Sequence, residues 1–359
     1  MASKINERLH VATEADVARA DARPVVASSK AHANRATPQS APHRRRSVSA
    51  HAEQLVTRLT AGADGGAASA LHALEESLRA TLGKLRELAG PRLSADTLAA
   101  VDQELLAIAE PFLVLIEKYF RAEVSGLEHM PRGPALVVGN HNAGITFIEP
   151  FFLGHAWNQY TNGRDNLRFL AHDAMVALPV IGNMLIKLGV VRAAHEAADA
   201  VLAAGQKVVV FPGGNYEAFR PFRERFRVDF GGKTGFARLA LRHRIPIVPV
   251  LSVGGHETFF VLQRGAALAR LLGLKKYLRS ELCPLFLGLP FGIGFGPIFH
   301  LPLPAKITVE VGEPMTFDEY GVDAADDREA AKRVSSAVQA RLQQMMDRRE
   351  ATRRWPVIG

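Results

Sequence analysis

Cysteine and aromatic residues are scarce in this sequence. A single cysteine, Cys283, stands among 359 residues, which excludes an internal disulfide and fits a reducing compartment. Aromatic residues make up only 7% of the chain. Because no alternation of basic and aromatic residues offers a surface for stacking bases, we expect no nucleic acid among the partners.

Long apolar runs are also missing. A membrane-spanning helix needs roughly 18 or more consecutive apolar residues, and the nearest approach, residues 174–191, contains Pro179, Lys187 and two glycines. Residues 1–25 alternate charge with alanine and lack the apolar core of a secretory signal. We therefore expect a cytoplasmic protein, associated peripherally with the inner face of a membrane rather than spanning it.

The composition that remains is that of a basic globular protein. Hydrophobic residues make up 48% of the chain and charged residues 22%, and the net charge is +8. Such a chain can bury a sizeable core, and its charge favours anionic partners such as phosphate esters or an anionic membrane surface. Residues 1–66 have few large apolar side chains, so we expect a disordered basic tail, either solvated or weakly tethered to anionic lipid.

The hydrophobic pattern divides the remaining chain into three segments. Residues 67–120 are helical, with leucines at helical spacing up to Gly90 and a second helix that begins at an N-cap, Ser94. Residues 121–320 alternate strands and helices, and residues 321–359 contain a C-terminal helix. The expected strands are 122–126, 135–139, 167–171, 207–211, 247–250 and 306–311, and the expected helices between them are 149–157, 174–188, 196–204 and 234–242. This alternation predicts an α/β fold with a mostly parallel central sheet flanked by helices.

A histidine at the end of a buried strand is the first candidate for chemistry. Asn140 and His141 end the strand over 135–139, and Glu149 lies in the first turn of the next helix, where an apolar side chain would suit the core better. A histidine titrates near neutral pH, and a carboxylate beside it orients the ring, so the pair suits a general base acting on a hydroxyl group. The alternative is a buried, satisfied histidine and a glutamate at the positive end of a helix dipole.

Two further segments favour anion binding. The strand over 207–211 runs into Pro212, Gly213 and Gly214, whose backbone could approach an oxyanion or phosphate closely, and Glu217 could accept a bond from a substrate hydroxyl. The alternative there is a plain turn. Arg192 follows an apolar run and could present its guanidinium to a phosphate, or could lie on the surface.

Three basic or apolar stretches suggest contact with lipid. Arg220, Arg223, Arg225 and Arg227 form either a collar for headgroups or a solvated loop. Residues 259–279 have the composition of a basic amphipathic helix, which could lie in a membrane interface or pack on the core. The apolar but Pro- and Gly-rich residues 285–303 could line an acyl pocket, dip into lipid or form a buried loop.

Four of these blocks, taken in order, resemble the motifs of glycerolipid acyltransferases. They are Asn140-His141 with Glu149, residues 189–192, residues 211–214 with Glu217, and residues 247–250. The chain is most similar to the monoacylglycerol/diacylglycerol acyltransferase-like branch of the lysophospholipid acyltransferase superfamily, which has Pro-Gly-Gly-x-x-Glu where the wider family has Phe-Pro-Glu-Gly. The resemblance covers about residues 119–314.

The resemblance implies an enzyme that moves a fatty acyl group from acyl-CoA, or from acyl carrier protein, to a hydroxyl of a glycerolipid such as a lysophospholipid, monoacylglycerol or diacylglycerol. His141 would be the catalytic base and Glu149 its support. Asn140, Arg192, Pro212, Gly213, Gly214, Glu217 and Pro249 would contact the substrates, with Pro249 shaping the acyl pocket. Neither a metal nor a cofactor beyond the acyl-CoA co-substrate is expected.

The sequence departs from the family pattern at one point. The wider family has Asp five residues after the histidine, where this chain has Thr146; its nearest downstream carboxylate is Glu149, eight residues on. If Glu149 cannot reach His141, a catalytically inactive lipid-binding or membrane-tethering relative becomes the alternative. A hydrolase in which His141 activates water is the third hypothesis.

Overall fold

The computed structural model describes residues 67–96, 98, 100–142, 148–278, 281–289, 292–296, 301–353 and 355. All of them belong to one compact unit, Val48–Gly359. The predicted disordered tail over residues 1–66 lies outside the described residues, as does Thr146. The division of the rest of the chain at residues 120 and 320 stays a prediction.

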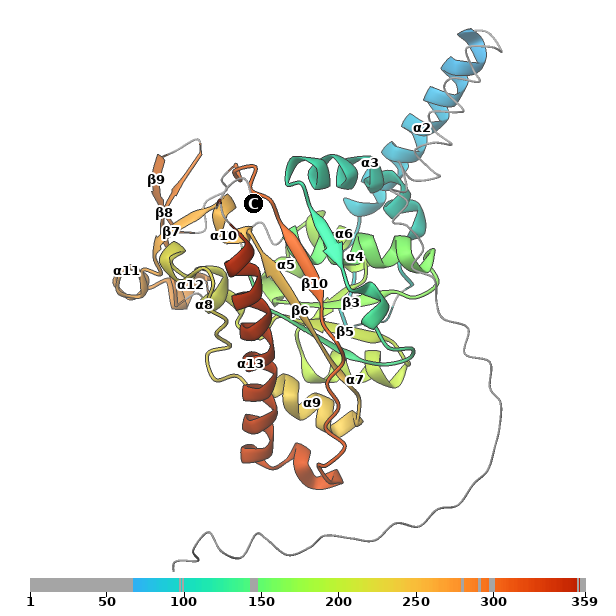
Figure 1. The fold of residues 1–359 in the computed structure, drawn as a ribbon. Helices are drawn as coiled ribbons and strands as arrows, with labels where there is room; N and C mark the ends of the chain where they lie inside the picture. Colours follow the sequence, from blue (N-terminus) through green and yellow to red (C-terminus); the bar gives the residue numbers. More distant parts are fainter. Residues whose placement is uncertain are drawn as a thin grey trace, which may run out of the picture. The chain divides into compact units, whose positions relative to one another are not determined.

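A seven-stranded sheet forms the centre of this unit (Figure 1). Its strands, from one edge to the other, are β1 (Glu123–Ser125), β10 (Thr308–Val311), β6 (Ile247–Val253), β2 (Leu136–Gly139), β5 (Lys207–Val210), β3 (Leu167–Ala171) and β4 (Val190–Arg192). Neighbouring strands are parallel everywhere except between β10 and β6. The predicted α/β fold with a mostly parallel sheet is therefore confirmed.

Helices cover both faces of the sheet, because successive residues of its central strands point to opposite sides. Leu136 and Val138 of β2 pack on one side with α7 (His195–Ala203), α9 (Gly235–His243) and α13 (Arg328–Thr352). Val137 packs on the other side with α4 (Ile148–Thr161) and the end of α3 (Gln103–Tyr119). Every residue of the central strands β2 and β5 is buried except Val210. Burial on both faces explains why residues 136–138 and 208–210 are apolar without interruption.

The direction in which successive strands are added to the sheet reverses between β2 and β5. The connection from β2 runs through α4 past β5 to β3, whereas the connection from β5 runs through α8 (Gly214–Ala218), η2 (Phe222–Glu224) and α9 past β2 to β6. Adjacent parallel strands whose connections leave on opposite faces open a crevice at their carboxyl ends, where ligands bind in α/β proteins. His141 and Gly213-Gly214 lie at these two strand ends.

The helices before the sheet differ from the prediction at their boundary. The helix α2 (Ala67–Leu88) ends before Gly90 as expected, but α3 begins at Gln103, capped by Asp102, whose carboxylate accepts from the Leu105 amide at 2.9 Å. The prediction of Ser94 as N-cap is wrong. Asp102 is the stronger start because it also pairs with Lys84 of α2 at 2.9 Å, so one carboxylate joins both helices.

The predicted helix over 174–188 is two helices, α5 (Asp173–Val176) and α6 (Ile181–Lys187). Pro179 lacks an amide hydrogen, and Val180 takes a left-handed φ of 63°, so neither can continue a helix. The edge strand β4 follows directly and was not predicted. Two short 3-10 turns, η1 (Leu127–His129) and η3 (Val322–Ala325), complete the connections around the sheet.

The prediction of a single basic helix over 259–279 is wrong. The short helix α10 (Gly255–Thr258) precedes this region, which consists of β7 (Phe260–Gln263), α11 (Ala266–Leu271) and α12 (Leu274–Leu278). Gly265 and Gly273, at φ values of 64° and 63°, separate the three elements. The strand β7 pairs antiparallel with β8 (Leu285–Gly288), and β8 with β9 (Gly292–Phe295), to form a second, small sheet. Within the described part of the chain, no helix has both the length and the hydropathy to span a bilayer.

Candidate active site

His141 and Glu149 are in direct contact. Nδ1 of His141 lies 2.9 Å from Oε1 of Glu149, and the same carboxylate accepts from the Asn142 amide at 2.9 Å. His141 is 8% exposed and Glu149 3%. Because a carboxylate only accepts, the ring must donate from Nδ1, which leaves Nε2 of a neutral imidazole as a basic lone pair. Glutamate at this longer spacing therefore reaches the histidine.

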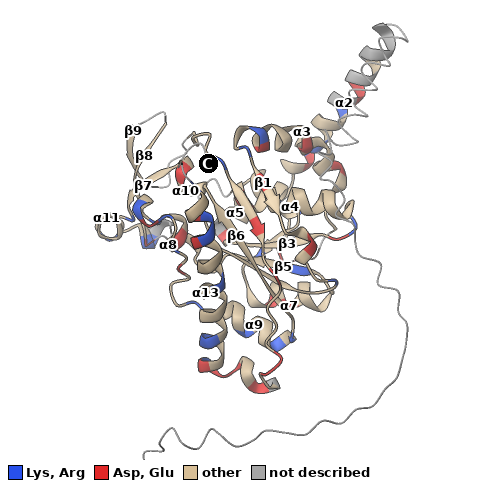
Figure 2. Ribbon diagram, in the orientation of Figure 1, with Lys and Arg blue, Asp and Glu red and all other residues tan. Residues whose placement is uncertain are grey.

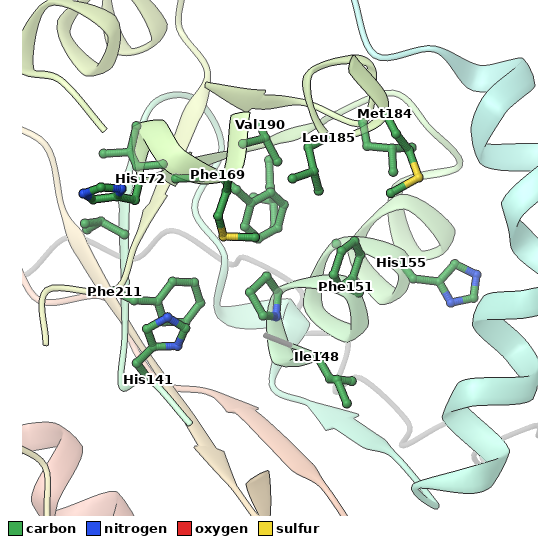
Figure 3. Close-up of a pocket in the computed structure, with 18 of the residues that line it drawn as sticks. His141, Ile148, Phe151, His155, Phe169, His172, Met184, Leu185, Val190 and Phe211 are labelled. Carbon is green, nitrogen blue, oxygen red and sulfur yellow. The ribbon is translucent and has the colours of Figure 1, made fainter. Parts of the chain in front are cut away.

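The ring of His141 is also held from the side. Phe211, which follows β5, stacks on it with centroids 5.1 Å apart and planes 26° from parallel, and Figure 3 shows the two rings face to face. Gly139 makes this stack possible, because a Cβ there would lie 2.6 Å from Cε1 of Phe211. The stack and the Glu149 bond together fix both the plane and the tautomer of the imidazole.

A large apolar cavity begins at His141. It has a volume of about 1590 Å³ and is lined by α3, α4, α6 and the strands β3 and β4. Apolar side chains on its wall include Ile148, Phe151, Phe169, Leu185 and Val190 (Figure 3). The polar or charged side chains on it include His172, Asn158, Asn215 and Lys233. A cavity of this size and lining suits a long hydrocarbon chain with its polar end near His141.

Asn140 joins two strands rather than facing the cavity. Its amide nitrogen donates to the Ser252 carbonyl at 2.9 Å and its amide oxygen accepts from the Ser252 amide at 2.7 Å. The side chain is fully buried. Asn142 donates to the same carbonyl at 2.6 Å. These bonds tie the end of β2 to β6, so Asn140 sets the position of the His141 backbone. Asn140 is not among the residues that line the cavity, and its predicted contact with substrate stays a prediction.

Glu217 also holds the His141 backbone. It is fully buried, and its carboxylate accepts from the amides of His141 at 2.9 Å and Asp229 at 3.2 Å and from Nη1 of Arg220 at 3.3 Å. Burial raises the pKa of Glu217, and the positive charge of Arg220 and the two amide donors oppose that rise. With these donors in place and no exposed surface, the carboxylate does not face a substrate hydroxyl, contrary to the predicted role.

The Pro212-Gly213-Gly214 turn is built around this carboxylate. A Cβ at Gly213 would clash with the side chain of Glu217, so only glycine fits there. The Gly214 amide donates to the Phe211 carbonyl at 3.2 Å and is not free for an anion. Gly214 itself lines the cavity beside Lys233, whose Nζ lies 3.3 Å from the point where a Gly214 Cβ would stand. Lys233, rather than the backbone of Gly214, is therefore the group here that suits an anion.

A buried arginine and histidine complete the support of His141. Nη2 of Arg220 lies 3.0 Å from Nε2 of His256, and both side chains are buried. Arginine only donates, so Nε2 of His256 accepts and its Nδ1 carries the proton. The His256 ring also bonds to the His141 backbone; burial and then the charge of Arg220 hold the pKa of His256 well below its usual value. Arg220 is thus not part of an exposed basic collar.

Sequence reasoning missed His256, although it stands three residues after β6, at the same sheet edge as His141. Gly254, with a φ of 103°, turns the chain there and was the available signal. The sequence analysis assigned no separate role to Lys233 or to His172. These groups come from chain positions far from His141 and meet it only at the shared sheet edge.

Arg192 and Pro249 are placed away from the cavity wall. Arg192 ends β4, and its Nε pairs with Asp96 at 3.0 Å and with Asp173 at 3.5 Å. Pro249 lies inside β6, where it is buried opposite Val138. Neither is among the residues that line the cavity, and their roles in binding phosphate and shaping the acyl pocket stay predictions. Among the described residues, no three His, Cys, Asp or Glu side chains gather into a metal site.

Comparisons with known proteins agree with this geometry. Residues 121–253 match the family model described as Acyltransferase. An uncharacterised protein of Mycobacterium tuberculosis is 34% identical over 283 residues, which are 78% of this chain and 76% of that protein. The mouse protein described as "DGAT1/2-independent enzyme synthesizing storage lipids" is 27% identical over 218 residues, 61% of this chain and 58% of that protein.

Among solved structures, the 1-acyl-sn-glycerophosphate acyltransferase PlsC of Thermotoga maritima is similar with a TM-score of 0.43 at 16% identity, over 70% of this chain and 83% of that one. The family model spans both strand ends that carry His141 and the Pro-Gly-Gly turn. The extent of the mycobacterial match carries the likeness well beyond that model, into the flanking helices. This chain belongs to the Acyltransferase family.

Proposed function

We propose that this protein transfers a fatty acyl group from acyl-CoA to a hydroxyl of a glycerolipid, with His141 as the general base. The observation that carries the proposal is the buried His141–Glu149 pair, at 2.9 Å, at the head of a large apolar cavity. The bond to Glu149 holds a proton on Nδ1, so Nε2 is the nitrogen that would take the proton of the acceptor, and the cavity offers room for an acyl chain that ends beside it. Both features are needed to bring a thioester carbonyl and a lipid hydroxyl together.

The steps follow from the acid–base chemistry of the imidazole. Nε2 of His141 takes the proton of the acceptor hydroxyl as its oxygen attacks the thioester carbonyl carbon. The C–S bond of the tetrahedral intermediate then breaks, and the imidazolium returns the proton to the departing sulfur, so that an ester and a free thiol are formed. Glu149 stabilises the imidazolium between the two steps. No covalent enzyme intermediate is required.

Lys233 is the cation that we assign to the phosphate groups of the donor or acceptor. It lines the cavity beside Gly214, whose amide donates to the Phe211 carbonyl. An ammonium group binds phosphate as a point charge and gains from the low dielectric of an apolar cavity. Acyl carrier protein, whose prosthetic arm also ends in a thioester, is the alternative donor.

Neutral glycerolipids are the acceptors that we place first among the candidate classes. The mouse relative is described as an enzyme that synthesises storage lipids, and apolar side chains form most of the wall of the cavity. Monoacylglycerol and diacylglycerol fit such a wall better than a charged lysophospholipid does. We further propose that the protein works at an anionic membrane surface, because its acceptors reside in lipid and its net charge is +8.

The test is an assay of the purified protein with labelled acyl-CoA or acyl carrier protein and a panel of monoacylglycerol, diacylglycerol and lysophospholipid acceptors. General-base assistance is worth about 10²–10⁴-fold, so His141→Ala should lower kcat by at least roughly that factor. Glu149→Gln should cost as much or less, and the double variant should be far from additive because the two residues act as a unit.

Two outcomes of this assay would contradict the proposal. Turnover by His141→Ala within a few-fold of the wild type would remove His141 as the base. Release of free fatty acid from acyl-CoA at the same rate with and without acceptor would identify a hydrolase instead. Circular dichroism of each variant supplies the control that the fold is intact.

A further inference from the structure

One face of the β8–β9 hairpin is apolar and exposed. The hairpin pairs Leu285 with Phe295 and Leu287 with Ile293, and positions two residues apart on paired strands share a face. Leu287 is 46% exposed, Ile293 72% and Phe295 54%. We call these four side chains the hairpin face. Single exposed apolar residues are common on proteins, but a contiguous apolar set on one sheet face marks a surface for a partner.

The opposite face of the hairpin is packed, so its orientation is defined. Phe286 is fully buried against Phe259 and Val261. Gly294 lies opposite it, where a Cβ would stand 2.6 Å from Cζ of Phe286. Glycine on the inner face therefore lets Phe286 lie flat under the hairpin. A shift of register by one residue would lose this fit, so the hairpin face stays directed outward.

The hairpin is joined to the mouth of the cavity. Leu289, just beyond β8, forms a bridge with Leu301, and Leu301, 56% exposed, lines the cavity together with Pro302. Tyr119 of α3 donates to the Pro302 carbonyl at 2.7 Å. Two further exposed side chains of α3, Phe112 and Leu115, also line the cavity. Exposed apolar groups therefore continue from the hairpin to the cavity and on to α3.

The charges around the hairpin complement an anionic lipid surface. Residues 285–296 contain no charged side chain, and Figure 2 shows an uncharged ribbon at β8 and β9. The neighbouring helices α11 and α12 carry Arg270, Lys275 and Lys276, all exposed, and of these Lys275 pairs with the exposed Glu281 at 2.7 Å. An apolar wedge beside basic groups is the arrangement by which peripheral proteins enter the headgroup region.

We propose that the hairpin face inserts into the interfacial region of a lipid bilayer and places the cavity mouth against the membrane. This inference rests on the proposed function, because it explains how a membrane-resident acceptor reaches His141. It replaces the electrostatic binding expected from a basic helix over 259–279, since that helix is divided and Arg220 is buried. Insertion of apolar groups depends little on salt, whereas binding by charge alone is screened at physiological ionic strength.

The experiment measures binding of the full-length protein to vesicles by co-sedimentation. The wild type should bind neutral phosphatidylcholine vesicles in high salt and bind vesicles with added phosphatidylglycerol more tightly. Ile293→Ser/Phe295→Ser should weaken binding to neutral vesicles by about tenfold or more, because two apolar side chains no longer leave water. Ile293→Leu/Phe295→Leu, which keeps the apolar character, should restore it.

Controls separate this surface from others. Leu82→Ser removes an exposed apolar side chain, 54% exposed, from α2 and should leave binding unchanged, and the melting temperature of each variant reports its fold. The inference is overturned if the serine double variant binds like the wild type, if Leu82→Ser weakens binding equally, or if the wild type binds only anionic vesicles and is released by salt. The wild type could instead form dimers without lipid and fail to bind vesicles. If the serine double variant dissociates those dimers, the hairpin face is the contact with a second copy of the chain.

Failure of this inference and failure of the proposed function give different results. The serine double variant should keep its turnover of water-soluble short-chain substrates while its turnover on vesicles falls with its binding. His141→Ala should lose turnover on both substrates and bind vesicles normally. An active His141→Ala with intact vesicle binding would therefore reject the catalytic proposal alone.

Discussion

His141 owes its position to buried polar residues that never face the cavity. Glu217 accepts from its amide, the His256 ring bonds to its backbone, and Arg220 links the two at 3.3 Å and 3.0 Å. Buried polar groups are costly unless all of them are paired. The network therefore holds the backbone of His141 in one place, as Glu149 and Phe211 hold its ring.

The first prediction concerns the charge state of His256. Its pKa in the folded protein is well below the unfolded value of about 6.5, first because of burial and then because of Arg220. Below pH 6.5 the unfolded chain binds a proton that the folded protein refuses, so the free energy of unfolding should fall as pH drops, by up to about 1.4 kcal/mol per pH unit. Urea unfolding between pH 5 and pH 8 measures this slope.

His256→Gln is the matched variant for that measurement. Its amide oxygen can accept from Arg220, but it does not titrate. The slope below pH 6.5 should become shallower by about the contribution of one proton relative to the wild type. Equal slopes for wild type and variant would show that His256 is protonated in the folded protein, contrary to the assigned tautomer.

The second prediction separates two candidate phosphate ligands. Lys233 lines the cavity, whereas Arg192 pairs with Asp96 and Asp173. Hydrogen bonds to charged groups are worth about 1.5–3 kcal/mol, so Lys233→Ala should raise KM for the acyl donor by about tenfold or more, with a smaller change in kcat. Arg192→Ala should have the lesser effect on KM. Steady-state kinetics with acyl-CoA measure both, and the reverse order would return the role to Arg192.

At the scale of elements, the cavity depends on the contact between α3 and α4. His155 of α4 lies 2.7 Å from Glu117 of α3 and 3.8 Å from Glu110. Burial lowers the pKa of His155, but the hydrogen bond to Glu117 and the charges of both glutamates outweigh it, and the pKa is raised. In Figure 3 the ring points away from the apolar side chains of the cavity. The ion pair thus fastens α3, which lines the cavity, to α4.

The third prediction follows from the sign of that shift. A raised histidine pKa contributes stability that is fully present below the unfolded value of about 6.5 and is lost as pH rises through the folded value. Glu117→Gln should therefore lower the free energy of unfolding on the order of 1.5–3 kcal/mol at pH 5.5 and by less at pH 9. Urea unfolding at the two pH values measures this. A cost that is independent of pH would mean that His155 is neutral in the folded protein.

At the scale of the whole molecule, the apolar stripe of the C-terminal helix fixes α13 to the sheet. Val334, Val338, Leu342 and Met345 recur at helical spacing, and all four are fully buried in one core cluster. Arg353, just beyond the helix, binds Glu257 and the Lys306 carbonyl. The segment at the end of α13 therefore holds α10, the short helix that carries both Glu257 and His256.

The fourth prediction concerns the basic tail. Residues 1–66 contain few large apolar side chains, so they have little surface with which to pack on the core. A truncated chain starting at Gly66 should keep the melting temperature of the full chain and its turnover of soluble short-chain substrates. Differential scanning calorimetry and the acyl-transfer assay measure the two quantities. A large drop in either would show that the tail docks on the domain.

The fold class and the place of the candidate site could be derived from the sequence because both depend on local patterns. Apolar runs such as residues 135–139 and 208–211 identify strands buried on both faces. Parallel strands end at one edge of a sheet, so the residues that follow these two strands, His141 and Gly213-Gly214, lie at the same edge. The sequence left open whether Glu149 could reach His141, and the contact of 2.9 Å between the two side chains answers that question.

The partners of buried polar groups could not be derived in this way. Asn140 binds Ser252, 112 positions later, and Arg220 binds His256, 36 positions later; nothing in the local spacing selects these partners. The exposed hairpin face could not be derived from local spacing either. Phe286 and Ile293 are equally apolar in the sequence, and only the packing of Phe286 on Phe259 directs Ile293 outward. The sequence alone indicated the buried parallel strands and the strand end at which His141 stands. The tertiary structure decided which side chains serve as framework, which face the cavity and which are left exposed, because burial and hydrogen bonding depend on neighbours that are distant in the chain.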